Sequence, residues 1–80
     1  FMAGLTVAPN PTSGEVRVEL KNGFVAQRIQ AFDALGRPLA EWEAGEIRGT
    51  LDLSLWGSGV RYVTVTTTDG WSTTRRVVVQ

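Results

Sequence analysis

The sequence predicts an all-β fold, an immunoglobulin-like or fibronectin-like β-sandwich of about seven short antiparallel strands. Apolar residues alternate with polar ones through most of the chain, as Val16, Val18 and Leu20 do, and this is the period of a half-buried strand. Turn-forming residues separate these runs about every ten residues, which is typical of such sandwiches. No run has apolar residues at helical spacing over three turns. A small closed barrel would give a similar pattern, so it remains the alternative architecture.

We expect the strands, in chain order, at residues 5–8, 15–20, 27–33, 38–44, 49–54, 60–67 and 73–79. The segments that separate them are rich in Gly, Pro, Asn or Asp, which supply fixed or positive φ angles. They are residues 9–14, 21–23, 33–36, 57–59 and 69–70. Asp69 and Gly70 are the strongest hairpin signal, because a two-residue type I′ turn favours Asp-Gly. The last two strands should therefore pair antiparallel.

The size of the chain limits what it can be. Eighty residues fit one domain, and without cysteine or histidine its stability must come from packing alone. Eight basic residues balance eight acidic ones, so no net field favours nucleic acid or an anionic membrane. The apolar runs are far shorter than the roughly 20 residues of a transmembrane helix. Because the chain starts Phe1-Met2 without a leader, we expect residues 1–80 to be one domain from a larger protein.

Enzyme chemistry is not expected, because the sequence has no His, no Cys and no phosphate-binding glycine loop. We therefore expect no catalytic residue, no cofactor and no metal site. Asp33, Asp52 and Asp69 fall at turns or strand ends, where Asp is favoured for its hydrogen bonds to the backbone. The glutamates are expected on solvated faces or loops, at Glu15, Glu19, Glu41, Glu43 and Glu46.

The three tryptophans receive different predictions. Trp42 shares a strand face with Ala40 and Ala44, so it is expected in the core. Trp56 is expected to close one end of the sandwich. Trp71 directly follows the last turn and is expected to be exposed, where it could contact a glycan or a partner protein.

The Arg75-Arg76 pair precedes three valines near the C-terminus and permits two interpretations. Charges beside a hydrophobic strand discourage aggregation through the strand edge. Alternatively, a receptor could recognise this basic, β-forming end, for example by adding a strand to it. An uncovered edge could also support a weak homodimer.

Four segments, in order and with matching spacing, resemble the type A C-terminal sorting domains of the type IX (Por) secretion system. They read LTVAPNPTSG at residues 5–14, FDALGR at 32–37, LDLS followed by SGV within 51–60, and RRVVV at 75–79. The family's motif positions fall on Pro9, Asn10, Pro11 and Gly14, on Asp33, Leu35, Gly36 and Arg37, on Gly59 and Val63, and on Arg75 and Arg76. We expect the prolines to fix the chain after the first strand, the glycines to permit tight turns or bulges, and the basic tail to be accessible.

The resemblance implies a signal that directs a larger exported protein through the periplasm and across the outer membrane, to the cell surface or the outside. It implies binding to an outer-membrane shuttle protein and the translocon. A sortase similar to cysteine proteases would act upstream of the domain and attach the cargo to the surface, although some family members keep the domain. The alternative function is a fibronectin-like spacer or carbohydrate-binding module of a secreted hydrolase.

Two positions depart from the family pattern. Arg61 stands where the family commonly has an aromatic residue, and Gly57 where it commonly has proline. By alternation Arg61 shares a face with Val63 and Val65, so its guanidinium must reach the rim or find a carboxylate.

Overall fold

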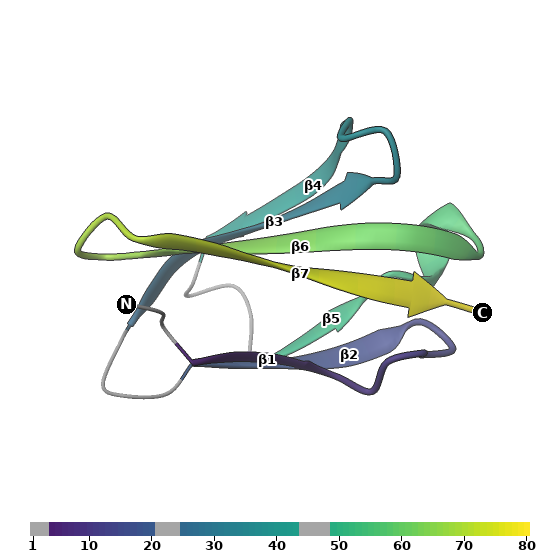
Figure 1. Ribbon diagram of the computed structural model, residues 1–80, viewed down its shortest axis with the longest axis horizontal. Helices are drawn as coiled ribbons and strands as arrows, with labels where there is room; N and C mark the ends of the chain where they lie inside the picture. Colours follow the sequence, from purple (N-terminus) through teal and green to yellow (C-terminus); the bar gives the residue numbers. More distant parts are fainter. Residues whose placement is uncertain (1–3, 21–24, 44–48) are drawn as a thin grey trace.

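The computed structural model describes residues 4–20, 25–43 and 49–80, and in them the chain forms two antiparallel sheets packed face to face (Figure 1). The three-stranded sheet has the order β1-β2-β5, and the four-stranded sheet has the order β4-β3-β6-β7. The predicted β-sandwich is therefore confirmed. The strands are β1 (Leu5–Ala8), β2 (Glu15–Leu20), β3 (Ala26–Asp33), β4 (Pro38–Glu43), β5 (Thr50–Asp52), β6 (Gly59–Thr67) and β7 (Ser72–Val79).

Six strands begin and end within one residue of their predicted bounds. The strand expected at 49–54 is wrong in its second half, because Ser54–Trp56 form a short 3-10 turn, η2. The Asp52 carboxylate accepts hydrogen bonds from the Ser54 backbone N–H (2.9 Å) and hydroxyl (2.6 Å), and these local bonds end the strand. The turn expected at 21–23, with Ala44 and Glu46, lies outside the described residues.

The core lies between the sheets and follows the period of two in each strand. In β6, for example, Val63 and Val65 are fully buried, while Tyr62 before them and Thr64 between them are not. The buried apolar residues are Leu5, Val16, Ile29, Ala31, Leu51, Leu53, Val63, Val65, Val77 and Val79. Trp42, which was expected in the core, is only partly buried and packs against this cluster, and Trp56 does the same.

The β6–β7 hairpin is confirmed, but its two-residue turn is wrong. The Thr67 N–H donates to the Trp71 carbonyl (2.7 Å), so the loop contains three residues instead of two. The Gly70 N–H returns to the Thr67 carbonyl (3.1 Å) with Gly70 at φ +94°, as in three-residue hairpins that place Gly in the left-handed position. In the described part of the chain, no helix is long and apolar enough to cross a bilayer.

Candidate recognition surface

The segments that the sequence singled out gather at one end of the sandwich, which we call the motif end. Figure 1 shows there the loop after β1, the β3–β4 turn, the chain entering β6 and the end of β7. The β6–β7 hairpin and the start of β1 lie at the opposite end. Antiparallel pairing of neighbouring strands produces this gathering, because it brings alternate connections to the same end.

Asn10 connects the first of these segments to the last. Its Nδ2 donates to the Arg76 carbonyl (2.9 Å), and its Oδ1 accepts from the Val78 N–H (2.9 Å). An amide side chain donates from its nitrogen and accepts at its oxygen, as a peptide group does, so Asn10 acts on the edge of β7 as a neighbouring strand would.

Thr12 extends the same contact toward the C-terminus. Its N–H donates to the Val78 carbonyl (2.9 Å), and its carbonyl accepts from the Gln80 N–H (2.8 Å), which makes a parallel bridge opposite Val79. We call residues 10–12 the clamp. The clamp covers the outer edge of β7 from Arg76 to the end of the chain.

Gly14 holds the loop against η2. The Leu53 N–H donates to its carbonyl (2.7 Å), and a Cβ at Gly14 would lie 2.6 Å from the Ser54 Cβ. A side chain at this position therefore cannot fit without moving the backbone. Pro9 and Pro11 flank Asn10, are both exposed, and both follow cis peptide bonds.

The β3–β4 turn is organised by Asp33. Its Oδ1 accepts from the Leu35 and Arg37 N–H groups (both 2.9 Å), and its Oδ2 meets the Arg37 Nε at 2.8 Å. The hydrogen bond from the Arg37 backbone is the largest cause that lowers the pKa of Asp33, helped by the Arg37 side chain and the Leu35 N–H. Gly36 has φ +82°, and the Leu35 side chain projects into solvent, 79% exposed. The turn thus presents an apolar side chain and a cation at the motif end.

Arg61 contradicts the expectation of a rim position or a carboxylate partner. It is 7% exposed, and its guanidinium donates to the carbonyls of Trp56 (2.6 Å) and Val60 (2.8 Å). Weaker contacts reach the carbonyls of Gly57 (3.3 Å) and Ser58 (3.5 Å). The loop after η2 turns these acceptors inward, so they take the place of a carboxylate. Val63 is fully buried in the core, so its side chain is not at the surface and supports the fold.

Gly59 makes room for this buried cation. It has φ +137°, and a Cβ there would lie 2.9 Å from the Arg61 Nη1. The Arg61 Nε is buried and has no partner among the described residues. The guanidinium therefore fixes the loop at some cost in unsatisfied polarity.

The two C-terminal arginines do not form one basic patch. Arg75 is opposite the buried Val63 and is half-buried, with its Nη1 donating to the Thr74 carbonyl (3.0 Å). Arg76 is opposite Tyr62 and lies exposed on the outer face of the four-stranded sheet. The expectation of a freely accessible basic tail is corrected accordingly. Arg76 is accessible, but the strand edge beside it is already occupied by the clamp.

The family model of the secretion system C-terminal sorting domain matches residues 6–80 of the chain. The chain belongs to this family. No curated protein matches the sequence. Membership means that the chain is a C-terminal sorting signal of type IX secretion, which implies contact with the secretion machinery and export across the outer membrane.

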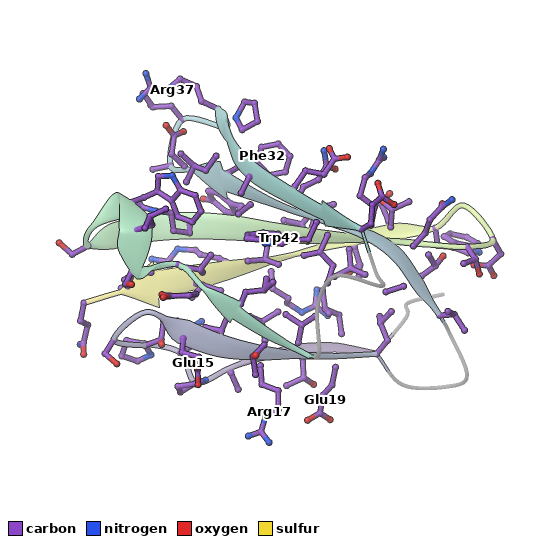
Figure 2. The ribbon with its side chains drawn as sticks, turned by 180° about the vertical axis from the view of Figure 1, so that it is seen from behind. Glu15, Arg17, Glu19, Phe32, Arg37 and Trp42 are labelled. Carbon is purple, nitrogen blue, oxygen red and sulfur yellow. The ribbon has the colours of Figure 1, made fainter. Side chains whose placement is uncertain are left out.

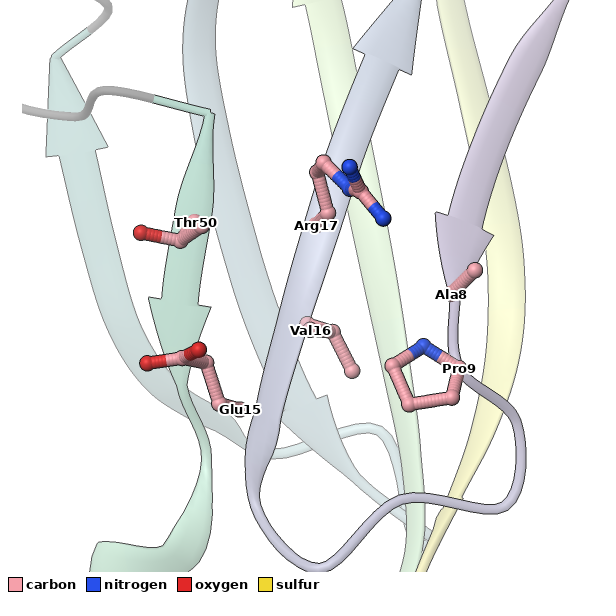
Figure 3. Close-up of a pocket in the computed structure, with 6 residues that line it drawn as sticks. All are labelled: Ala8, Pro9, Glu15, Val16, Arg17 and Thr50. Carbon is pink, nitrogen blue, oxygen red and sulfur yellow. The ribbon is translucent and has the colours of Figure 1, made fainter.

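Two further surface features of the sorting domain are an exposed tryptophan and a shallow hollow. Trp71, at the opposite end, is 52% exposed, which confirms its expected exposure, whereas its contact with a glycan or partner stays a prediction. A shallow hollow of about 280 Å³ lies on the three-stranded sheet, and Figure 3 shows the residues around it. It is lined by Ala8, Pro9, Glu15, Val16, Arg17 and Thr50. In the described residues, no group of His, Cys, Asp or Glu is placed to hold a metal ion.

Sequence reasoning missed the connection between Asn10 and β7 and the partners of Arg61. Asn10 between two prolines signals a loop, but its partners are 66 and 68 residues away. No local pattern contains such a pairing. The sequence signal for the second contact was the pair Gly57 and Gly59, closely followed by Arg61. Two glycines allow a loop to wrap around the Arg61 guanidinium.

Proposed function

We propose that the export machinery recognises the motif end of this sorting domain as a folded surface and not as a linear tail. The clamp is the observation that supports this proposal. Through Asn10 it holds residues near the start of the chain on the last strand, so the exposed groups of both segments have a fixed relation only in the folded domain.

The motif-end residues divide into those that can touch a partner and those that shape the surface. Exposed side chains available for contact are Pro9, Pro11, Leu35, Arg37 and Arg76. The residues that shape the surface through turns or packing are Gly14, Gly36, Gly59, Asp33 and Val63. Arg75 is half-buried on the edge strand β7, where it donates to the Thr74 carbonyl. Large apolar and arginine side chains are the residue types that most often dominate protein interfaces.

The partners that the family resemblance implies would act at opposite ends of the domain. An outer-membrane shuttle protein would receive the motif end and pass the domain to the translocon. A sortase would cut upstream of Leu5 and attach the cargo to the cell surface. Because β1 begins at the end opposite the motif end, recognition and processing would take place on different sides of the domain (Figure 1).

The test is a reporter protein that carries a signal peptide and residues 1–80, produced in a bacterium with type IX secretion. We expect the reporter at the cell surface or in the medium, and in the periplasm when residues 1–80 are absent. The size of the exported product distinguishes removal of the domain from its retention. Asn10→Ala should reduce export, whereas Ser13→Ala, an exposed change in the same loop, should not. Normal export of an Asn10→Ala variant whose Val78 amide is shown to have lost its protection would contradict the proposal.

A further inference from the structure

A groove of about 450 Å³ opens along the side of the sandwich where β4 and β5 are the last strands of their sheets. Its volume lies in the range of about 300–1,000 Å³ that is typical of binding sites. It is lined by Ala40, Trp42, Thr50, Leu51, Asp52, Leu55 and Trp56. The groove is on the side of the sandwich opposite the clamp, because β7 and β1 form the other pair of outer strands.

One wall of the groove is an open strand edge. The Val18 N–H donates to the Gly49 carbonyl, and the Leu53 N–H donates to the Gly14 carbonyl. These two bonds show which residues of β5 direct their backbone groups toward β2, because every second residue of a strand does so. The backbone groups of Thr50 and Asp52 therefore point away from β2. They have no partner among the described residues. The edge therefore offers two N–H donors and two carbonyl acceptors at strand spacing.

The interior of the groove is apolar. Trp42 and Trp56 are only partly covered by the core against which they pack, and Leu55 is 82% exposed. Leu51 points inward from β5, between Thr50 and Asp52, which are exposed. A residue placed beside Leu51 on an added strand would point into this apolar space, whereas its neighbours would point to the outer face.

The outer rim of the groove is acidic. Glu15 and Asp52 are in register on neighbouring strands, where like charges destabilise the pair. Figures 2 and 3 show Glu15 on the outer face of the three-stranded sheet, reaching from β2 over β5. Neither carboxylate has an ion-pair partner in the described part of the chain. Glu41 of β4 is also exposed, but it lies on the outer face of the four-stranded sheet, where its Oε1 accepts from the Gln30 amide (3.2 Å). A cation beside Asp52 would relieve this repulsion.

We propose that the β5 edge binds an extended peptide segment in which apolar residues alternate with Lys or Arg, as a fourth strand of the three-stranded sheet. Its apolar side chains enter the groove beside Trp42 and Trp56, and its basic side chains lie beside Asp52 and Glu15. Main-chain hydrogen bonds give the affinity, and the alternation gives the specificity. This site does not depend on recognition of the motif end.

The experiment titrates the 80-residue chain, labelled with nitrogen-15, with an end-capped hexapeptide of alternating Val and Lys. We expect saturable shifts of the Thr50 and Asp52 amide signals. Thr50→Pro removes one outward N–H from an edge strand and should weaken binding by about tenfold. Glu15→Gln should weaken it by about two- to fivefold at low salt. Glu19→Gln is the matched control, because Glu19 is exposed on the same face of β2 but lies opposite β1, and it should have no effect.

Four results would overturn the proposal. One is the absence of binding at millimolar peptide. Two others would mean that charge alone attracts the peptide: equal binding of a hexapeptide with the same composition in two blocks, and equal weakening by Glu19→Gln and Glu15→Gln. The last is loss of the Thr50 and Asp52 signals on concentrating the chain without peptide, which would assign the edge to a second copy.

Discussion

At the scale of single residues, three polar side chains hold the connections at the motif end, each with atoms that its residue type provides. Asn10 donates and accepts at once along β7, Asp33 accepts two backbone N–H groups within its turn, and Arg61 donates to several carbonyls of one loop. The Asp33 bonds are local, so the sequence predicted the type of contact correctly. The Asn10 and Arg61 contacts depend on packing, so the sequence indicated unusual residues without their partners.

Gly36→Val should lower the free energy of unfolding by about 1–3 kcal/mol, because a β-branched residue is strained at φ +82°. No heavy atom beyond the adjacent residues lies within 4 Å of a Cβ built there, so the cost comes from the backbone and not from a clash. Ala34→Val, an exposed change in the same turn, should cost less than about 0.5 kcal/mol. Urea unfolding measures both variants, and equal stability of the two would refute the assigned turn conformation.

Asp33→Asn should reduce the dependence of stability on pH in the acid range. The pKa of Asp33 is lowered on folding, chiefly by the Arg37 backbone N–H, so its contribution is present above the unfolded pKa of about 4. That contribution is lost as the pH falls through the folded pKa. Melting temperatures measured from pH 6 to pH 2 should fall less steeply for the variant, although Asp52, whose pKa is also lowered, keeps part of the slope. Parallel curves for parent and variant would contradict the assigned role.

Arg61→Met should destabilise the domain by about 1–3 kcal/mol, because it removes the Arg61 donors from the part-buried carbonyls of Trp56 and Val60. The loss of the unpartnered Nε offsets part of this cost. Arg28→Met, at an exposed position of β3, is the control and should change stability little. Urea unfolding of both variants decides between these expectations, and an Arg61→Met variant as stable as the parent would show that the guanidinium does not hold the loop.

At the scale of elements, the alternation of residues and the turn signals predicted the strands well, because both are local properties of the chain. The exception is β5, which the bonds of Asp52 to Ser54 end at Asp52, so that η2 begins at Ser54, where strand was expected. Strand order, and the covering of the β7 edge by the clamp, arise from contacts between distant segments and could not be predicted from local patterns. Alternation along β7 predicts that Arg75 and Arg76 point to opposite faces of the sheet. It does not predict that Arg75 is half-buried or that the clamp covers the strand edge beside Arg76, because both depend on contacts with distant segments.

Asn10→Ala should open the C-terminal edge of β7 and cost about 1–2 kcal/mol, the contribution of two partly exposed hydrogen bonds. Amide hydrogen exchange gives the sharpest measurement. The Val78 N–H, which donates to Asn10, should exchange faster, whereas the Val77 N–H, which faces β6, should exchange as in the parent. Unchanged protection of Val78 would mean that the clamp does not form in solution.

At the scale of the whole molecule, the two ends of the sandwich carry different segments of the chain. The family motifs, scattered over the sequence from Pro9 to Arg76, meet at the motif end, while β1 begins at the other (Figure 1). Figure 2 shows Phe32 and Arg37 on the four-stranded side and Glu15, Arg17 and Glu19 on the outer face of the other sheet. A weak homodimer through an open strand edge stays a prediction.

Export by two variants that differ only in which outer-face arginine is lost tests the central claim most directly. Arg76 and Arg28 are both exposed on the outer face of the four-stranded sheet, but Arg76 lies toward the motif end and Arg28 toward the opposite end. In the reporter fusion, Arg76→Gln should leave much of the reporter in the periplasm, whereas Arg28→Gln should be exported like the parent, with both variants melting within a few degrees of it. If the two variants are exported equally, the motif end is not the surface that the machinery recognises.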